Sequence, residues 1–515
     1  MKKALAAALI LPLIFLALIC SITGRVLASA EDVSFYEETL AGDIGAADGL
    51  SISGAVSLDG YLFWDEAIDL KTGGFSAKAS FRRSSSREKE DHFSDPDSHI
   101  DLYDLIDVNY GSVAAEELEY DQGLARAFDE LLAKTPAGSE GRELIRVSDH
   151  IEYYPIAFDI AVRWGQEDRW TAFGYSPDYV TRDDMQDPEV YISYKLSDFF
   201  RIPVIKDQHA WIELYNSGEE AKGTTGSQAV TWGVEPDETH DIFSLNTESV
   251  EAGDSLYFWF SNRTRDGKLV DTSLIPGGYG IYRLPIGTLR GEDEGGNVWE
   301  TPYAPLADDL SLFYPVKEDA FILHIWADKQ AGRLLVHIVD DNKYYVDIIE
   351  ISSGTKLQKL EMGPAEMTGD MRWSWDEDSF LCEFEDLEDF ETVWTRSPEM
   401  HMTLIAGGSG GYELKIDVPI DDIFKSDPNM MNTSAKGRSL AFDGERLAVC
   451  GCRDDDGYNS YMNMGCAPYV FVFGPEGLRY SGVFRNSLDD AGKEIFDYSK
   501  RPRPWGRNAV KASWN

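Results

Sequence analysis

The stretch that decides the fold lies between residues 334 and 360. It begins with Leu334-Leu335-Val336-His337-Ile338-Val339 and, after Asp340-Asp341-Asn342-Lys343, continues with Tyr344-Tyr345-Val346-Asp347-Ile348-Ile349-Glu350-Ile351. The turn Ser352-Ser353-Gly354-Thr355 then leads into Lys356-Leu357-Gln358-Lys359-Leu360. Short runs rich in Val, Ile and Tyr that are separated by polar turns predict antiparallel strands. The stretch therefore predicts a three-stranded meander.

The same order of segments recurs on both sides of this meander. In each copy an apolar strand precedes a loop and a second strand that begins with tyrosine. The first strands of the three further copies are residues 255–260, 379–384 and 446–452, and their second strands are 279–286, 412–418 and 469–473. Repeated units of this kind are typical of arrays that bury small sheets against one another. Because the spacing between copies is uneven, the number of copies stays open.

In this pattern the chain resembles the blades of secreted bacterial β-propellers, whose paired strands end in turns such as Ser353-Gly354. The resemblance covers about residues 241 to 484 and consists of strands rather than of a catalytic motif. It implies an all-β fold, a β-propeller of short antiparallel meanders, in which radial stacking covers both faces of each sheet. The alternative is a multi-hairpin β-sandwich.

The region from residue 50 to residue 240 is also rich in predicted strands. A segment at 61–73 looks like part of a blade, and further strands are predicted at 151–164, 190–195 and 210–214. We expect these strands either to complete the propeller or to form a separate β-domain. The alternation of apolar and polar residues in each run carries the prediction.

One helix is predicted in this first half of the chain, over residues 113–134. Ser112 can cap its start, Phe128 and Leu132 fall near one face, and Lys134 with Pro136 marks its end. We interpret it as a surface helix that packs on a sheet.

The N-terminus reads as a signal peptide. Lys2 and Lys3 precede an uncharged, mostly apolar run over residues 4–22, and Ala28 and Ala30 occupy the positions of a cleavage site. We predict cleavage after Ala30, which leaves about 485 residues. The alternative is an uncleaved N-terminal membrane anchor, because a run of this length can span a bilayer.

These observations divide the chain into five segments. They are a signal peptide over 1–30, a linker over 31–49, the β-rich region with the helix over 50–240, the propeller blades over 241–490, and a C-terminal tail over 491–515.

The charge of the chain restricts its partners. Its formal net charge is −44, and removal of three basic residues with the signal peptide makes it −47. A surface of this sign repels nucleic acid and anionic membranes. We therefore expect no nucleic-acid partner, and contact with a membrane only through a retained N-terminal segment. A protein or a carbohydrate remains as the class of ligand.

Four cysteines follow the signal peptide: Cys382, Cys450, Cys452 and Cys466. Cys450 and Cys452 alternate along one strand and share a face, which disfavours a bond between them. A disulfide between Cys452 and Cys466 would close a hairpin loop, and it is the pairing that we predict.

Motifs that carry chemistry are scarce. Asp454, Asp455 and Asp456 lie in a predicted loop and could bind calcium through oxygen ligands, but they lack the spacing of an EF-hand. A solvated loop explains them as well, so we assign no metal site and no cofactor, with calcium as the alternative.

A serine, two tryptophans and two histidines also stand in positions that could form sites, but structural roles explain them. The serine in Gly407-Gly408-Ser409-Gly410-Gly411 lies between two predicted strands, which indicates a turn rather than a nucleophile elbow. Trp373 and Trp375 share a strand face and could stack on sugars, although core packing explains them as well. His324 and His337 lie in predicted strands, where histidine is usually structural. No catalytic residue is assigned.

We expect an exported, non-enzymatic β-propeller that binds a partner or ligand at the cell envelope, through loops of variable length between its strands. One alternative is a propeller-type hydrolase or lyase that acts on polysaccharide. The other is a membrane-anchored structural surface protein.

Overall fold

The computed structural model describes most of the chain between residues 35 and 514. The described residues are 21, 35–58, 62–70, 74–81, 98–104, 113–114, 122–154, 156–164, 168–175, 188–220, 228–236, 247–263, 268–292, 298–364, 369–376, 379–386, 401–408, 411–419, 439–454, 466–486 and 511–514. Within these ranges, no helix is both long and apolar enough to cross a membrane. The predicted signal peptide, with Ala28 and Ala30, lies outside them.

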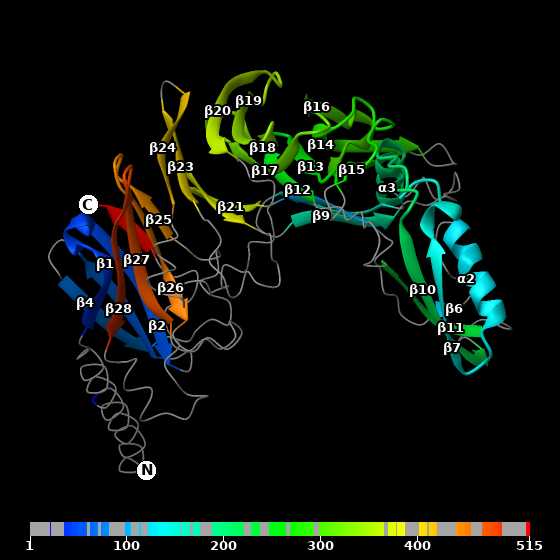
Figure 1. Cartoon of the computed structure of the whole chain (residues 1–515), viewed down its shortest axis with the longest axis horizontal. Coiled ribbons are helices and arrows are strands. Elements are labelled where there is room, and N and C mark those ends of the chain that lie inside the picture. The colour runs from blue at the N-terminus through cyan, green and yellow to red at the C-terminus, as the bar shows by residue number, and fades with distance from the viewer. Residues whose placement is uncertain are drawn as a thin grey trace, which may run out of the picture. The chain divides into compact units, whose positions relative to one another are not determined.

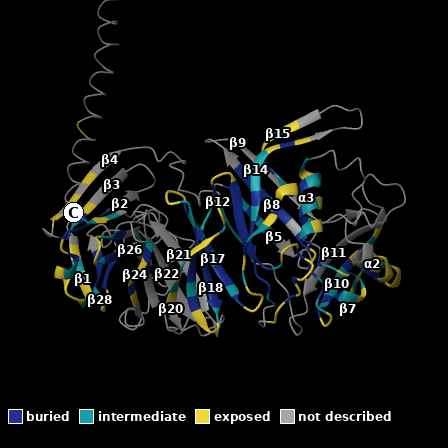
Figure 2. Ribbon diagram, turned by 90° about the horizontal axis from the view of Figure 1, so that it is seen from above, coloured by how far each residue is buried: buried dark blue, intermediate teal, exposed yellow. Residues whose placement is uncertain are grey.

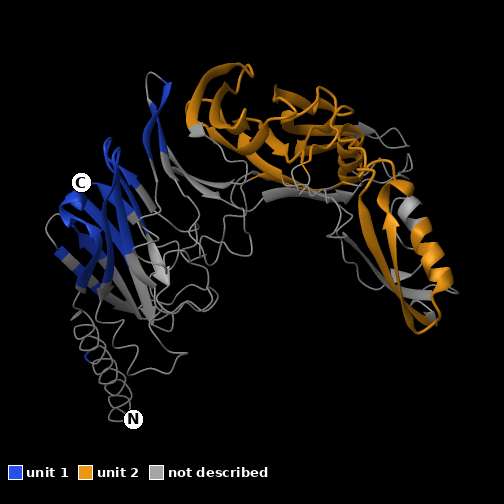
Figure 3. Ribbon diagram, in the orientation of Figure 1, with its two compact units in different colours: residues 1–93, 366–515 blue, residues 94–365 orange. Residues whose placement is uncertain are grey.

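The described part of the chain is all-β, with seven antiparallel sheets and two α-helices (Figure 1). It divides into two compact units, residues 1–93 with 366–515 and residues 94–365 (Figure 3). This division differs from the predicted boundary at residue 240, because the second unit joins strands from both sides of that position. A sandwich of two sheets, the alternative fold, does not match seven small sheets.

The second unit holds four of the sheets. Their strands, in spatial order, are β5 (His99–Asp104), β8 (Ile156–Trp164) and β9 (Asp168–Tyr175); β6 (Val113–Ala114), β11 (Gln228–Pro236), β10 (His209–Glu220) and β7 (Ser139–Arg146); β12 (Thr247–Ala252), β13 (Ser255–Phe260), β14 (Gly280–Glu292) and β15 (Val298–Pro305), with β16 (Ser311–Pro315) also paired to β14; and β17 (Phe321–Asp328), β18 (Arg333–Asp340), β19 (Lys343–Glu350) and β20 (Lys356–Pro364).

The first unit holds the other three sheets. Their strands, in spatial order, are β29 (Lys511–Trp514), β2 (Leu50–Leu58), β3 (Leu62–Asp69) and β4 (Gly74–Phe81); β21 (Gly369–Asp376), β22 (Ser379–Asp386), β23 (His401–Gly408) and β24 (Gly411–Pro419); and β1 (Phe35–Gly42), β28 (Gly477–Asn486), β27 (Cys466–Gly474), β26 (Leu447–Asp454) and β25 (Ser439–Phe442).

The meander predicted from residues 334–360 is confirmed as strands β18, β19 and β20, with β17 added in front. Six consecutive residues of β18, from Leu334 to Val339, are buried, so side chains on both of its faces lie in the core (Figure 2). A continuous apolar run is the expected sequence of a strand covered on both faces. The turn predicted at Ser409-Gly410 also joins two paired strands, because Gly408 lies opposite Gly411.

The helix prediction is right at its C-terminal end and wrong at its start. Helix α2 covers Gln122–Lys134, whereas Val113–Ala114 forms strand β6 and pairs with β11. Phe128 and Leu131 are buried and anchor the helix on its sheet. Residues 115–121, between this strand and the helix, lie outside the described residues.

The strand predicted over 190–195 is wrong, because helix α3 (Pro188–Phe199) occupies this segment. Pro188 suits a first helical turn, where its missing N–H has no partner to lose. Ile192 and Leu196 lie four residues apart and are fully buried. Phe200, just after the helix, packs edge-to-face on Phe258, with ring centroids 5.8 Å apart. Tertiary packing thus overrides the strand preference of the β-branched and aromatic residues.

Both ends of the chain form strands where a linker and a tail were predicted. Strand β1 lies within the predicted linker 31–49 and pairs with β28, with Phe35 opposite Asn486. Strand β29 lies within the predicted tail 491–515 and pairs with β2, with Leu50 opposite Trp514. The N-terminal strand therefore completes a C-terminal sheet, and the C-terminal strand completes an N-terminal one. Short segments rich in small and polar residues gave no periodicity from which to predict these strands.

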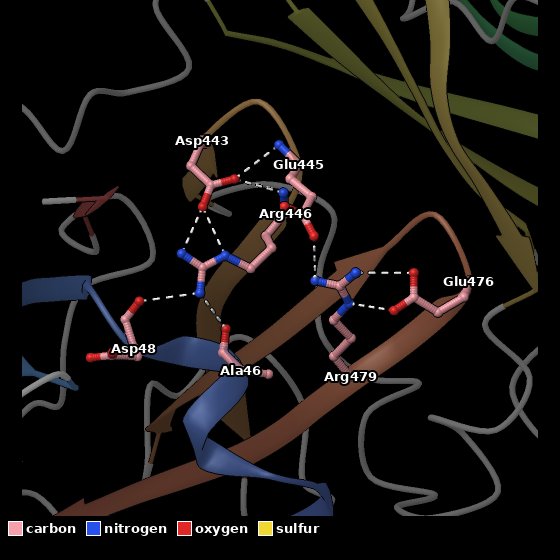
Figure 4. Close-up of polar contacts among 7 residues, drawn as sticks. All are labelled: Ala46, Asp48, Asp443, Glu445, Arg446, Glu476 and Arg479. Atoms are coloured by element: carbon pink, nitrogen blue, oxygen red, sulfur yellow. Dashed lines mark hydrogen bonds and ion pairs between the residues drawn. The ribbon is translucent and has the colours of Figure 1, made fainter.

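A polar cluster fixes this exchange of strands (Figure 4). The Arg446 guanidinium donates to the Ala46 and Asp48 carbonyls, at 2.9 and 3.1 Å, just after β1. It also lies 4.1 Å from the ring centroid of Trp514 in β29. Burial alone would raise the pKa of Asp443, but hydrogen bonds from the backbone and the side chain of Arg446 hold it below its usual value. One arginine therefore contacts the segments at both chain ends.

Candidate functional site

Helix α2 covers only one face of the β6–β11–β10–β7 sheet. On that face Ile145, Ala210, Ile212 and Leu214 are buried with the apolar side of the helix. Gly141 lies on it as well, and a Cβ at this position would lie 2.1 Å from Thr135 Oγ1. The close approach of the helix end to the sheet therefore needs glycine here.

The opposite face of the same sheet is open to solvent. Successive side chains of a strand point to opposite faces, so Trp211, Glu213 and Tyr215 lie on the side away from α2. Tyr215 is 43% exposed and Leu144 is 38% exposed. Leu144 lies opposite Trp211 in the register of β7 and β10. Large apolar side chains on an exposed sheet face are typical of binding surfaces.

An arginine joins these residues into one surface. Arg142 lies opposite Glu213, and its Nε is 2.7 Å from Glu213 Oε1. The same guanidinium lies 4.4 Å from the ring centroid of Trp211. We call this surface the β10 face and define it as Arg142, Leu144, Trp211, Glu213 and Tyr215.

The β10 face combines residue types that dominate binding energy. Trp, Tyr and Arg are the residues most enriched among the hot spots of interfaces, since they offer large area with a polar end. The ion pair between Arg142 and Glu213 is partly exposed, so it contributes little to stability. Its polar atoms therefore remain near the surface, where a ligand can reach them.

The loop between β13 and β14 offers further exposed apolar residues. Val270 and Ile275 are buried and tie the loop to the core, whereas Leu269 and Leu274 are exposed. The backbone N–H of Val270 donates to the Asn262 carbonyl at 2.8 Å, which closes the base of the loop. The loop thus presents two leucines on an anchored backbone.

A second polar site lies where three sheets meet in the second unit. Thr247 and Ser249 of β12 accept hydrogen bonds from the backbone of β5, at 3.2 Å from Leu102 N and 3.0 Å from Ile100 N. Glu248 points the other way and accepts from Ile325 N of β17, at 3.0 Å. Alternate side chains of β12 therefore satisfy backbone groups on the edge strands of both neighbouring sheets.

Glu248 also binds two ring nitrogens. His324 Nδ1 lies 3.2 Å from Glu248 Oε2, and Trp259 Nε1 donates to the same oxygen at 3.3 Å. The side chains of Glu248 and His324 are 34% and 21% exposed. A carboxylate and an imidazole at this distance could exchange a proton with a bound molecule. The structure thus gives His324 a partner that the sequence did not indicate.

His337 lies opposite His324 in the ladder of β17 and β18, next to a bulge at Leu323. The two imidazole rings are stacked, with centroids 6.5 Å apart. His337 is fully buried, and burial, with a smaller contribution from His324, lowers its pKa well below the usual value. Its place in the core agrees with a structural role.

Several residues predicted as sites are not brought together by the described backbone. Cys452 lies opposite Pro468, and Cys466 lies opposite Asp454, so the two cysteines are on neighbouring strands but offset by two positions. Their disulfide stays a prediction, as their side chains are not described. Asp454 ends β26, whereas Asp455 and Asp456 lie outside the described residues. Among the described residues, no cluster of three or more potential metal ligands occurs.

Cys450 and the two paired tryptophans do not form a site in the described structure. Cys450 is a free, buried thiol, and burial raises its pKa. Trp373 and Trp375 lie in strand β21, where only the backbone is described. Neither observation adds a site.

Sequence reasoning missed the β10 face, although it predicted a strand over 210–214. The signal was present in the alternation from His209 to Tyr215, where Ala210, Ile212 and Leu214 alternate with Trp211, Glu213 and Tyr215. An alternating strand whose outer residues include two aromatic rings predicts an open face with binding potential. Glu248 gave no comparable signal.

Comparison with known proteins assigns no family. No family model and no curated protein matches the chain. Hydrazine synthase from Kuenenia stuttgartiensis is similar at 11% identity and a TM-score of 0.19, covering 52% of this chain and 74% of its own. TolB from Acinetobacter baumannii is similar at 11% identity and 0.21, covering 91% and 84%. The NanB sialidase from Streptococcus pneumoniae is similar at 8% identity and 0.23, covering 87% and 90%. Scores at this level leave the function to be argued from the residues themselves.

Proposed function

We propose that this chain is an exported, non-enzymatic binding protein of the cell envelope and that the β10 face is its main recognition surface. The observation that carries the proposal is the open sheet face on which Trp211 and Tyr215 flank the ion pair of Arg142 and Glu213. The exposed leucines of the β13–β14 loop provide a second contact region. Rigid strands hold the first surface, so little conformational entropy is lost when a ligand binds.

Cosedimentation with an insoluble envelope preparation from the producing cell tests this function. We expect the mature chain to sediment with it, and Trp211→Ala and Tyr215→Ala to lower the bound fraction at least fivefold. Leu414→Ala removes an exposed apolar side chain from the first unit and serves as the control. Equal binding of all four proteins, or no binding of the parent chain, would overturn the proposal.

The finer architecture that we propose is a β-propeller in which six of the seven sheets are blades and the β6–β11–β10–β7 sheet is an insertion. Two features support it. The edge strands β5, β12 and β17 are linked by side chains of β12, and the exchanged terminal strands β1 and β29 complete sheets made by the other end of the chain. Such an exchange is one way to protect the edges of an array of sheets.

Small-angle X-ray scattering tests the propeller. A compact particle of about 485 residues has a radius of gyration of about 23 Å. We expect a value close to this for the mature chain. A radius of gyration above about 30 Å in monodisperse solution would indicate separate units and contradict a closed array.

Export with signal cleavage rests on the N-terminal sequence. The intact mass of the protein recovered outside the cytoplasm is expected to match a chain that begins at Glu31. A mass that includes residues 1–30, recovered in the membrane fraction, would instead favour the uncleaved anchor.

A second candidate function, a polysaccharide hydrolase or lyase, is favoured by one observation. Glu248 and His324 form a partly exposed acid–base pair next to the Trp259 indole. If this pair is catalytic, incubation with polysaccharides will release reducing ends or unsaturated products, and His324→Ala will abolish them. If no product forms while binding is retained, the enzyme function is excluded and only the binding function remains.

A further inference from the structure

Three side chains of the β10 face form a row along one strand. Residues two apart on a strand are separated by about 6.7 Å, so Trp211, Glu213 and Tyr215 form a line in which the two rings are about 13 Å apart. On the neighbouring strand β7, Leu144 lies opposite Trp211 and Arg142 lies opposite Glu213, so the surface is two strands wide. A surface of this form fits an extended polymer better than a compact small molecule.

The backbone beneath this face is already fully engaged. Strand β10 lies between β7 and β11 and pairs with both over most of its length. A peptide therefore cannot add to β10 as a further strand, which is the mode that supplies main-chain hydrogen bonds in many peptide complexes. A ligand on this face meets side chains only.

The side chains present two kinds of chemistry in alternation. The rings of Trp211 and Tyr215 are flat apolar surfaces with a polar edge. Between them, the Arg142 guanidinium supplies N–H donors and the Glu213 carboxylate supplies acceptors. The C–H faces of a pyranose ring can stack on the two aromatic rings. Its neighbouring hydroxyl groups, each a donor and an acceptor, can bond to the guanidinium and the carboxylate.

The charge on this face argues against an ionic polymer. On the same side of β7, β10 and β11, two arginines, Arg142 and Arg146, stand with three glutamates, Glu140, Glu213 and Glu235, which leaves a net charge of only −1, whereas the chain as a whole carries −44. A polyanion would be repelled by the rest of the molecule, and a polycation would be attracted to all of it rather than to this face. A surface with a net charge this close to zero is best suited to a neutral polymer.

We propose that the β10 face binds a linear, neutral polysaccharide by stacking sugar rings on Trp211 and Tyr215 and by hydrogen bonding sugar hydroxyls to Arg142 and Glu213. This inference rests on the proposed binding function and names its ligand class.

Affinity electrophoresis of the full mature chain tests it. Native gels contain galactomannan or mixed-linkage β-glucan as neutral probes and polygalacturonate as the anionic probe. We expect retardation by a neutral probe, an apparent Kd raised at least tenfold by Trp211→Ala or Tyr215→Ala, and little change for Tyr215→Phe, which keeps the ring. Leu414→Ala should behave as the parent chain. Because the contacts are not ionic, affinity should change less than twofold between 20 and 500 mM salt.

Three results would overturn the inference. They are retardation by neither neutral probe, retardation by polygalacturonate alone, and retardation that Tyr215→Ala leaves unchanged. If the chain also sediments with the envelope preparation in a Tyr215-dependent way, the binding function stands and a peptide or protein ligand replaces the polysaccharide. If it does not, both proposals fail together. Circular dichroism of each variant excludes misfolding as the cause of a loss.

Discussion

Strands β18 and β10 both lie in the middle of antiparallel sheets of the second unit, yet their side chains are distributed in opposite ways. In β18, the six residues between Arg333 and Asp340 are buried on both faces. In β10, Ala210, Ile212 and Leu214 are buried, whereas the residues between them reach solvent. The backbone pairing is similar, so the difference lies in what covers the second face.

The positions of the charged residues differ between the two strands in the same way. In β18 the charged residues stand only at the ends, where Arg333 pairs with Glu350 and Asp340 with Lys317. In β10 a charged residue, Glu213, stands in the middle of the strand and pairs across the ladder with Arg142. A strand that is covered on both faces is committed to packing, and a strand with one open face can bind.

A charge placed in the middle of each strand should have the largest and most different effects on stability. Val336 is fully buried, so Val336→Asp puts an unpaired carboxylate in the core and should cost more than about 4 kcal/mol or prevent folding. Tyr215→Asp should cost less than about 1 kcal/mol. Urea unfolding followed by tryptophan fluorescence measures both. If Val336→Asp does not fold, Val336→Ala, expected to cost about 2 kcal/mol, provides the measurable counterpart.

Ile212 and Tyr215 lie on opposite faces of β10 and test the difference within one strand. Ile212 faces α2 and is fully buried, so Ile212→Ala should lower the free energy of unfolding by about 2–4 kcal/mol. Tyr215→Ala, on the open face, should change it by about 0.5 kcal/mol or less. If urea unfolding shows similar losses of unfolding free energy for the two variants, the face that carries Tyr215 is covered in solution.

The buried His337 gives the stability of β18 a pH dependence. Its pKa in the folded chain is depressed by burial, so the unfolded chain, with a histidine pKa of about 6.5, binds more protons below that pH. The contribution of the neutral His337 to the free energy of unfolding is therefore fully present above about pH 6.5. It is lost as the pH is lowered, by up to about 1.4 kcal/mol per pH unit. Unfolding measured from pH 8 to pH 5 should show a smaller slope in His337→Gln. An unchanged slope would assign the dependence to other groups.

The ion pair at the end of β18 should contribute least to the free energy of unfolding. A hydrogen bond from Lys317, with a further contribution from Lys359, lowers the pKa of Asp340. A depressed carboxyl pKa stabilises the fold above the unfolded value of about 3.9 and loses this contribution as the pH falls through the folded value. Because Lys317 is exposed, Asp340→Asn should cost only about 0.5 kcal/mol at pH 7. The two proteins should converge in urea unfolding near pH 2.5, and a gap that persists there would contradict the ionic origin.

Much of the strand pattern could be predicted from sequence. Continuous apolar runs such as Leu334 to Val339 have no helical period and are bounded by turns, so strand and turn signals agreed. The segment 190–195 failed because its β-branched and aromatic residues favour a strand locally, while the buried contacts of Ile192 and Leu196 stabilise a helix. The terminal strands β1 and β29 failed because their partners lie more than 400 residues away in the sequence.

The candidate site was less accessible to sequence reasoning than the fold. The alternation in β10 was readable, but only the structure shows that Arg142, from another strand, lies beside Trp211 and Glu213. Likewise His324 was noticed as a residue of a strand, whereas Glu248 comes from a different sheet. Contacts between strands depend on register and on sheet order, and neither is contained in a single segment.

The exchange of terminal strands sets an order in time. Residues 94–365 form one continuous unit, so all its strands are available once that segment has been synthesised. The other unit needs residues 35–42 paired with 480–486, and residues 50–53 paired with 511–514. Strand β1 therefore stays unpaired until β28 has been made, and β2, which pairs with β3 early, keeps one edge open until β29 arrives. Completion of this unit therefore requires residues 511–514, and a chain truncated before Lys511 would lack strand β29.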